Sequence, residues 1–433
     1  MNQACMFSVL PAVRISDRGR PEFRLYGPAA DRVEIAVRRS GRICRTFSYA
    51  LEPGRLRAVF PGLEGIVGSL EFVLSFYGEG RLLEQHRYPY EIIASGTPST
   101  QLLDGCWISI YHWSESEARW FNGALKQMKD EDFGQHIRDM AAVGIRGVII
   151  QNLFDSAHYV ARHSMTVDTY DGRAYYPSAL YPGRMPIAAV DPVEAVLAAA
   201  DECGTHVFLG IGMFAWFDFS PESLEWHKRV AQEVFERYGH HPSFYGWYVS
   251  EEIGGDLYTS LIEVPPVHSG YVAPFFREFA AYVHRLAPTK PIAFAPNNIN
   301  FEAAEARWKE ILPYIDVLLP FAFARDLEHM NVDAIKRICT ECGTHMWVDM
   351  EIFSMPLDNG LVPKSMEALE REIRLYDAVE QVYGYQFTGL LTPPECPFDL
   401  GGDAARRLYR DYAEFFRRRT APAETGADLP HGS

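Results

Sequence analysis

Two glutamates stand at the ends of predicted strands and could form a catalytic pair. Glu252 ends the run FYGWYVSEE (residues 244–252), and Glu351 ends HMWVDME (residues 345–351). Hydrolysis of a glycosidic bond with retention of configuration needs a general acid and a nucleophilic carboxylate roughly 5–5.5 Å apart. We therefore expect Glu252 to act as acid/base and Glu351 as nucleophile, provided that the fold brings the two strand ends together.

Strand geometry separates Glu252 from the glutamate beside it. Successive residues of a strand point to opposite sides, so Ser250 and Glu252 share one side, whereas Val249 and Glu251 share the other. A general acid must also be partly desolvated to hold its proton near neutral pH. The aromatic residues expected around it are Trp247, Tyr248, Phe321 and Phe323. We expect Glu252 to face the site and keep Glu251 as a candidate substrate contact.

Polar and aromatic residues also follow the other predicted strands. Amides and carboxylates suit sugar hydroxyls, and aromatic rings suit the C–H faces of a sugar. These residues predict a neutral, polyhydroxylated ligand, a carbohydrate, and no metal or organic cofactor. Besides Glu251, the candidate substrate contacts are Tyr111, His112, Trp113, Gln151, Asn152, Trp216, Asn297, Asn298, Phe321 and Gln386.

These side chains can meet only if their strands belong to one parallel sheet. The predicted strands cover residues 106–111, 145–152, 206–214, 244–251, 291–297, 316–323, 345–351 and 385–391. Helical stretches alternate with them, which indicates βα units. We predict an α/β fold, a (β/α)8 TIM barrel, whose active site lies at the C-terminal ends of the strands. The runner-up is a doubly wound sheet, but no G-x-G-x-x-G follows a strand.

A different pattern precedes the barrel. The runs RVEIAV (32–37) and LEFVLSF (70–76) alternate apolar and other residues, as half-buried strands do. We predict a small immunoglobulin- or fibronectin-like β-sandwich over residues 1–97, the barrel over 98–418 and a disordered tail over 419–433. The sandwich is expected to pack against the barrel, with sugar binding as the alternative.

Composition excludes several partner classes. The 433 residues carry 41 Lys and Arg against 57 Asp and Glu, a net charge of -16, which repels nucleic acids and anionic membrane surfaces. No apolar run approaches the ~20 residues of a membrane helix. The first residues lack the pattern of a signal peptide, so a cytoplasmic location is expected. Seven cysteines, an odd number, predict free buried thiols. The oligomeric state is not predicted.

Several phrases resemble a known family. The barrel resembles the large glycosidase superfamily whose acid/base ends strand four, in a pattern of Trp followed later by Asn-Glu-Pro, and whose nucleophile ends strand seven. This resemblance implies that Glu252 is the acid/base, that Glu351, in VDMEIF, is the nucleophile, and that Glu251 replaces the Asn. The phrases ALKQMKDEDF, VIIQN, YYPSALYP, DPVEAVLAAADECGTHVFLGIG and GWYVSEEI resemble the DUF4434 family of glycosidase-like barrels over roughly residues 105–415.

Glu251 and Ile253 stand where that superfamily has Asn and Pro. The Asn helps to hold the sugar 2-hydroxyl there, so its replacement motivates an alternative function, a non-catalytic carbohydrate-binding barrel. Inversion of configuration, with carboxyl groups roughly 6.5–9.5 Å apart, is a second alternative. A lyase or isomerase on the same barrel is a weaker one, because it would use Tyr, His or Lys bases.

Overall fold

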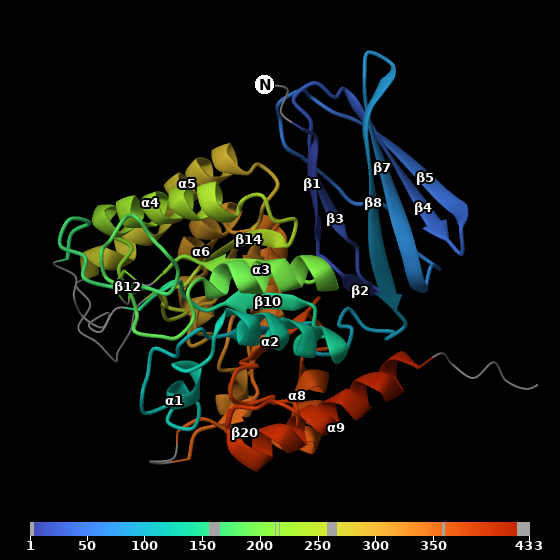
Figure 1. The fold of residues 1–433 in the computed structure, drawn as a ribbon. Coiled ribbons are helices and arrows are strands. Elements are labelled where there is room, and N and C mark those ends of the chain that lie inside the picture. The colour runs from blue at the N-terminus through green and yellow to red at the C-terminus, as the bar shows by residue number, and fades with distance from the viewer. Residues whose placement is uncertain are drawn as a thin grey trace, which may run out of the picture.

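The chain forms a β-sandwich followed by a barrel of alternating strands and helices (Figure 1). The computed structural model describes residues 4–155, 165–212, 214–215, 217–257, 266–356 and 360–421. The predicted tail falls, from residue 422 on, outside the described residues.

The sandwich consists of two sheets with a shared apolar core. The five-stranded sheet has the order β2 (Arg14–Ser16), β8 (Arg81–Ile93), β7 (Gly68–Gly78), β4 (Arg32–Arg39), β5 (Arg42–Ala50). The three-stranded sheet has the order β1 (Met6–Leu10), β3 (Glu22–Tyr26), β6 (Arg57–Val59). The alternating apolar residues of β4 and β7 are buried in the core, as their period of two predicts.

The barrel sheet is parallel and closes on itself. Its strands are β9 (Gly105–Ile108), β10 (Gly147–Ile150), β13 (His206–Gly210), β14 (Phe244–Val249), β15 (Ile292–Phe294), β16 (Val317–Leu318), β17 (His345–Met346), β18 (Val348–Glu351) and β21 (Val382–Tyr385). β17 and β18 flank Trp347 and share the seventh position, because β16 pairs with β17 while β18 pairs with β21. β21 then pairs with β9. The predicted (β/α)8 barrel behind a sandwich is confirmed, and closure excludes the doubly wound sheet.

The eighth strand was placed too far along the chain. It covers Val382–Tyr385 instead of residues 385–391. The segment after Tyr385 folds back through turns, with Leu390 and Leu391 N–H groups both donating to Phe387. Tyr385 is therefore the last residue of the strand and lies at the C-terminal face of the barrel. The sequence-based prediction makes it the first residue of the strand, at the N-terminal face.

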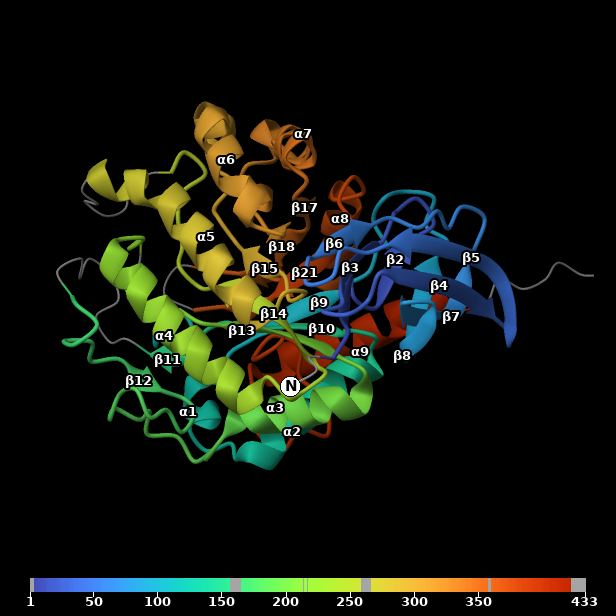
Figure 2. The same ribbon diagram turned by 90° about the horizontal axis from the view of Figure 1, so that it is seen from above.

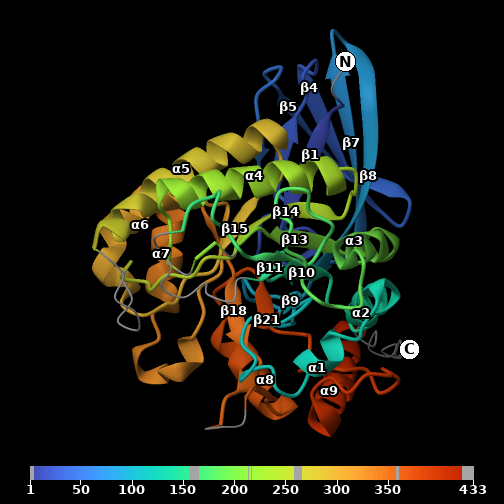
Figure 3. The ribbon, with the colours of Figure 1, turned by 60° about the vertical axis from the view of Figure 1, so that its left-hand side comes forward.

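Helices surround the sheet (Figures 2 and 3). They are α1 (Asn122–Leu125), α2 (Asp130–Ala142), α3 (Pro192–Cys203), α4 (Pro221–Tyr238), α5 (Pro266–Leu286), α6 (Glu305–Ile311), α7 (Val332–Cys342), α8 (Met366–Leu375) and α9 (Gly402–Thr420). Short strands β11 (Phe154–Asp155), β12 (Arg173–Ala174), β19 (Phe353–Ser354) and β20 (Val362–Pro363) lie in loops. Helices α3 and α7 both end at a left-handed glycine, Gly204 and Gly343, because such a cap disfavours a Cβ.

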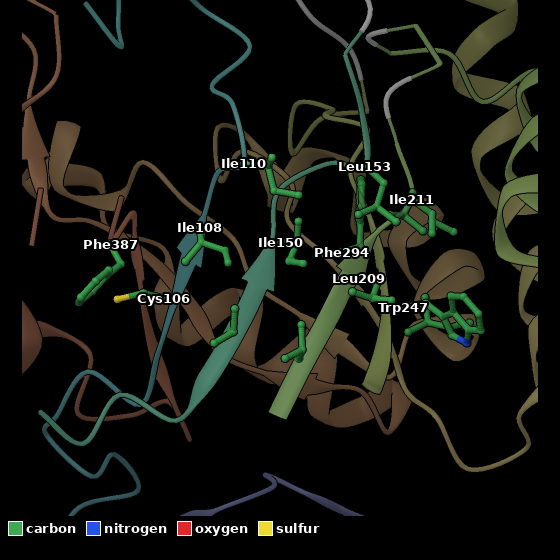
Figure 4. Close-up of a cluster of buried hydrophobic side chains, with 14 of the residues drawn as sticks. Cys106, Ile108, Ile110, Ile150, Leu153, Leu209, Ile211, Trp247, Phe294 and Phe387 are labelled. Atoms are coloured by element: carbon green, nitrogen blue, oxygen red, sulfur yellow. The ribbon is translucent and has the colours of Figure 1, made fainter. Parts of the chain in front are cut away.

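Alternate residues of the barrel strands build two apolar layers. One layer lies between the strands and helices and includes Trp247 (Figure 4). The other fills the barrel interior and includes Trp107, Tyr248 and Trp347. The parity expected for strand 244–252 is therefore confirmed up to Val249: Trp247 and Val249 face the helices, whereas Tyr248 faces the interior.

The sandwich covers the N-terminal end of the barrel through buried polar contacts. The Arg14 guanidinium donates to Asp104, just before β9, at 2.8 Å. The His345 ring, at the start of β17, lies between Glu22 of β3 (2.9 Å) and Glu380 (2.6 Å). Burial opposes protonation of His345, but the two carboxylates outweigh it and raise its pKa to about 10. The sandwich thus packs against the barrel, on the end opposite the C-terminal strand ends.

The sequence analysis also predicted free cysteine thiols and no membrane-spanning helix. All seven cysteines are free thiols, as predicted. Only Cys5, Cys106 and Cys339 are buried, whereas Cys44 is exposed and the other three are partly exposed, so the expected burial holds for three of the seven. No helix in the described ranges has the length and apolar character that a membrane crossing requires.

Candidate active site

A pocket of about 290 Å³ opens at the C-terminal ends of the barrel strands. This volume is near the lower end of the roughly 300–1,000 Å³ typical of ligand pockets. Its lining combines carboxyl groups, amides and aromatic rings. The lining residues are Trp113, Glu117, Gln151, Tyr248, Ser250, Glu251, Glu252, Ala295, Asn297, Phe321, Arg325, Asp349, Glu351, Phe353, Met355 and Tyr385.

Glu351 ends β18 and is held by a guanidinium. Arg325 Nε donates to Glu351 Oε2 at 3.1 Å, and Arg325 Nη2 donates to Glu351 Oε1. Behind the site, Lys364 Nζ donates to the Glu351 carbonyl at 2.5 Å and to Glu372 at 2.7 Å. A two-point contact such as that of Arg325 with both carboxylate oxygens fixes the orientation of a carboxylate and stabilises its charge. Glu351 is therefore held in a fixed orientation at the edge of the pocket.

Glu252 reaches the same pocket from the end of β14. The preceding residue on its side of the strand, Ser250, is anchored because its hydroxyl donates to the Gln151 carbonyl at 2.5 Å and accepts from the Gly212 N–H at 3.2 Å. A Cβ at Gly212 would lie 2.6 Å from Ser250 Cβ, so only glycine permits this approach. The anchored strand end delivers Glu252, which is half-buried, to the pocket that also contains Glu351.

Glu251 is turned away from open solvent into the loop after β13. Its side chain is 1% exposed, and Oε1 accepts from the Phe214 N–H at 2.9 Å. Burial raises the pKa of Glu251 well above its ordinary value. Burial disfavours the charged form of the neighbouring His227 as well and lowers its pKa to about 4. His227 Nε2 lies 3.8 Å from Glu251 Oε1. Glu251 thus anchors the loop after β13 through the Phe214 N–H, while its edge contributes to the pocket wall.

Two further carboxyl groups in the pocket have raised pKa values. Burial, with the charge of Glu351, raises the pKa of Asp349 well above its ordinary range, against the opposing effect of Arg325. Burial also raises the pKa of Glu117 to about 7, although Arg325 again opposes the shift. Ionisable groups with shifted pKa values that line one cleft are typical of functional sites.

The pocket brings together many of the residues proposed from sequence. Glu252 and Glu351 line it, as do the candidate substrate contacts Trp113, Gln151, Glu251, Asn297 and Phe321. Tyr248 and Phe321 supply aromatic walls near Glu252. The expectation that Trp247 and Phe323 would do so is wrong, because Trp247 packs on Phe244 and Phe323 packs near Tyr376, both on the helix side of the sheet.

The other candidate contacts that the structure describes do not line the pocket and instead support its loops. Trp216 lies outside the described residues. The others bond to neighbouring groups: Tyr111 to Glu115, His112 to Asn122 and Tyr385, Asn152 to the Phe154 carbonyl, Asn298 to the Phe321 carbonyl, and Gln386 to Ser109. Each of these side chains forms a hydrogen bond with a neighbouring backbone or side-chain group. The rule that barrel sites lie at the C-terminal strand ends does not predict such bonds.

Sequence reasoning missed Glu117, Phe353, Met355 and Tyr385 as pocket residues. Glu117 lies in the loop after β9, and its carbonyl accepts from the Leu361 N–H at 2.8 Å. That contact joins the loops after the first and seventh strand positions, a pairing that no local motif encodes. Tyr385 was missed because the eighth strand was misplaced. The position of Glu117 in a loop at the C-terminal face was the available signal.

One group of potential metal ligands occurs within the described part of the chain, and it lies away from the pocket. Glu194, His240 and His241 have ligand atoms within 4.8 Å of one another. His241 already pairs with Asp201 at 2.6 Å and with Glu194 at 3.2 Å, which accounts for its placement without an ion. That the pocket uses no metal or organic cofactor stays a prediction.

The chain is similar to several known proteins. A β-glucuronidase from Felis catus is 28% identical over 145 residues, which is 32% of this chain and only 20% of that protein. A candidate α-L-fucosidase from Bacteroides thetaiotaomicron superposes with a TM-score of 0.50 at 20% identity, over 73% of this chain and 95% of that one. A β-glucuronidase from Parabacteroides merdae gives a TM-score of 0.42 at 12% identity, over 96% of this chain and 52% of that one.

The likeness to the candidate fucosidase concerns the fold. The family match concerns the sequence itself and spans residues 103–397, which is more than half of the chain. The chain belongs to the DUF4434 family, described as a domain of unknown function.

Proposed function

We propose that the protein is a retaining glycoside hydrolase with Glu252 as acid/base and Glu351 as nucleophile. The observation that carries this proposal is that both carboxyl groups line one pocket at the C-terminal strand ends, with Glu351 held by Arg325. Aromatic and amide side chains in the same walls suit a sugar ring. The similarity to a segment of a β-glucuronidase supports the same reaction class.

In the proposed reaction Glu252 protonates the glycosidic oxygen while Glu351 attacks the anomeric carbon and expels the alcohol. The glycosyl–Glu351 ester is then hydrolysed by a water molecule, from which Glu252 removes a proton. Arg325 holds Glu351 in orientation. Burial raises the pKa values of Glu251 and Asp349 well above their ordinary range, which disfavours further negative charge beside the pair.

A screen with activated aryl glycosides of both anomeric configurations tests the proposal. Glu351→Ala should remove turnover and regain it with azide, which replaces the missing nucleophile, whereas Glu252→Gln should slow substrates with poor leaving groups most. Wild-type turnover in both variants would refute the assignment of these residues. Proton NMR of the first product formed distinguishes retention from inversion.

The second candidate function is a non-catalytic carbohydrate-binding barrel. Two observations favour it: Arg325 engages both oxygens of Glu351, and Glu251 replaces the Asn of related strand-four patterns. Saturable binding of an oligosaccharide by the wild-type protein, with no release of an activated leaving group from any glycoside in the screen, would select this candidate.

A further inference from the structure

The charge balance of the pocket restricts the sugar that it can take. Among the described residues that line it, Arg325 is the one cation, against the carboxyl groups of Glu117, Glu252 and Glu351. Two further carboxyl groups, those of Glu251 and Asp349, have pKa values that burial raises well above their ordinary range, which disfavours their charge. A carboxylate that leaves water needs a cation or several hydrogen-bond donors to replace its hydration. Whether a uronic acid fits therefore depends on whether Arg325 is available.

Arg325 is engaged by Glu351 through two nitrogens. If the guanidinium turned to a substrate carboxylate, it would leave Glu351, whose side chain is only 10% exposed, without its ion pair. The next cation along this wall, Lys364, lies behind the Glu351 main chain and pairs with Glu372 at 2.7 Å. Both cations already pair with a carboxylate, so an anionic sugar would have to compete with Glu351 or Glu372 for them.

Glu117 adds a carboxyl group that the two-glutamate reaction does not use. Its backbone is fixed by Leu361, and a Cβ on the neighbouring Gly360 would lie 2.7 Å from the Glu117 carbonyl oxygen. Its carboxyl oxygen lies 3.8 Å from His112 Nε2. Burial lowers the pKa of His112 to about 4, so this ring is neutral near pH 7 and offers no positive charge to Glu117. Because burial also raises the pKa of Glu117 to about 7, its carboxyl group is partly ionised near pH 7 and more fully ionised above it.

We propose that the pocket takes an uncharged sugar and rejects a uronic acid, and that Glu117 enforces this choice. The proposal rests on the proposed function for the identity of the pocket. An uncharged sugar offers hydroxyl donors to the Glu117 carboxyl group. The carboxylate of a uronic acid instead meets acidic side chains and, among the described lining residues, no cation that is not already paired. This specificity would differ from that of the β-glucuronidases to which the chain is similar, because their name denotes a uronic acid substrate.

Matched pairs of 4-methylumbelliferyl glycosides that differ only at C6 provide the kinetic test. They are glucosides against glucuronides and galactosides against galacturonides, in both anomeric forms. We expect the neutral member of the hydrolysed pair to have at least about 100-fold higher kcat/KM. Glu117→Gln should reduce this ratio at least tenfold, mainly through a lower KM for the uronide. Equal or faster hydrolysis of the uronide, or a ratio that Glu117→Gln leaves unchanged, would overturn the proposal.

A binding measurement separates this proposal from the proposed function. Ligand-observed NMR with Glu252→Gln compares the methyl glycosides of the same sugars, and Glu252→Gln is chosen because it leaves the Arg325–Glu351 pair in place. Binding of the neutral glycoside alone supports the proposal even if the wild-type enzyme hydrolyses nothing. Binding of the uronide, or of neither sugar, contradicts it.

Release of Arg325 supplies the matched control. Glu351→Gln removes the charge that engages the guanidinium, so we expect this variant to bind the methyl uronide at least tenfold more tightly than Glu252→Gln does. The double variant Glu351→Gln/Arg325→Ala should lose that gain. Equal uronide binding by the single and double variants would show that Arg325 is not the latent anion partner and would contradict the argument.

Discussion

The contact between Arg325 and Glu351 gives the sharpest prediction about the pocket. We expect Arg325→Ala to lower kcat/KM because Glu351 loses the guanidinium that orients it. A hydrogen bond to a charged group contributes about 1.5–3 kcal/mol. Since the Arg325 side chain is 54% exposed, water screens the pair, and the lower part of this range applies, about 1.5–2 kcal/mol. At about 1.4 kcal/mol per tenfold change, kcat/KM should fall about 10- to 30-fold.

The assay is steady-state kinetics on the activated glycoside found in the screen. Arg325→Lys should recover only part of the loss, because an ammonium keeps the charge but cannot make the two-point contact. The control is Arg337→Ala, since Arg337 pairs with Glu305 and Glu341 on the exposed surface of α7. An unchanged or increased kcat/KM in Arg325→Ala would refute the reasoning, because the ion pair would then restrain the nucleophile instead of positioning it.

Three further predictions concern buried polar groups. Glu251→Gln should keep activity within a few-fold, because the amide oxygen can still accept from the Phe214 N–H and the raised pKa already disfavours a charge there. Glu251→Ala should lose thermal stability because the Phe214 N–H loses its acceptor; equal melting temperatures would contradict this. The folded-state pKa of His345, about 10, exceeds its ordinary 6.5, so its stabilising contribution is complete below about pH 6.5 and is lost as the pH rises to 10. His345→Gln should therefore flatten the decline of the melting temperature over that range, and a parallel decline would exclude the assignment. Arg14→Ala should lower the free energy of unfolding, measured in urea, by about 3–5 kcal/mol, because it leaves the Asp104 carboxyl buried without its cation; a loss below about 1 kcal/mol would show that the pair matters little.

Local periodicity in the sequence was sufficient for the fold and for part of the pocket. The alternation of apolar residues predicted the sandwich strands, and the parity of residues 244–252 separated Tyr248 from Trp247 correctly. The rule that barrel sites lie at C-terminal strand ends placed Glu252, Glu351, Gln151 and Asn297 in one pocket. These features depend on neighbours along one strand, which a single sequence contains.

Features that depend on contacts between distant segments were not predictable in this way. Glu117 enters the pocket because its loop bonds to Leu361, and Arg325 reaches Glu351 from the turn after β16. The sequence also could not show that Gln386 would turn to Ser109 instead of the pocket. Such choices follow from three-dimensional packing and from the need to satisfy buried polar groups.

Trapping of the covalent intermediate tests the central claim most directly. A 2-deoxy-2-fluoro glycoside with an activated leaving group, matched to the sugar found in the screen, should inactivate the wild-type enzyme and add one sugar to the chain. Peptide mass spectrometry should place that sugar on Glu351, and Glu351→Gln should remain unlabelled. A label on another residue, or turnover that yields the inverted anomer with no label, would contradict the account.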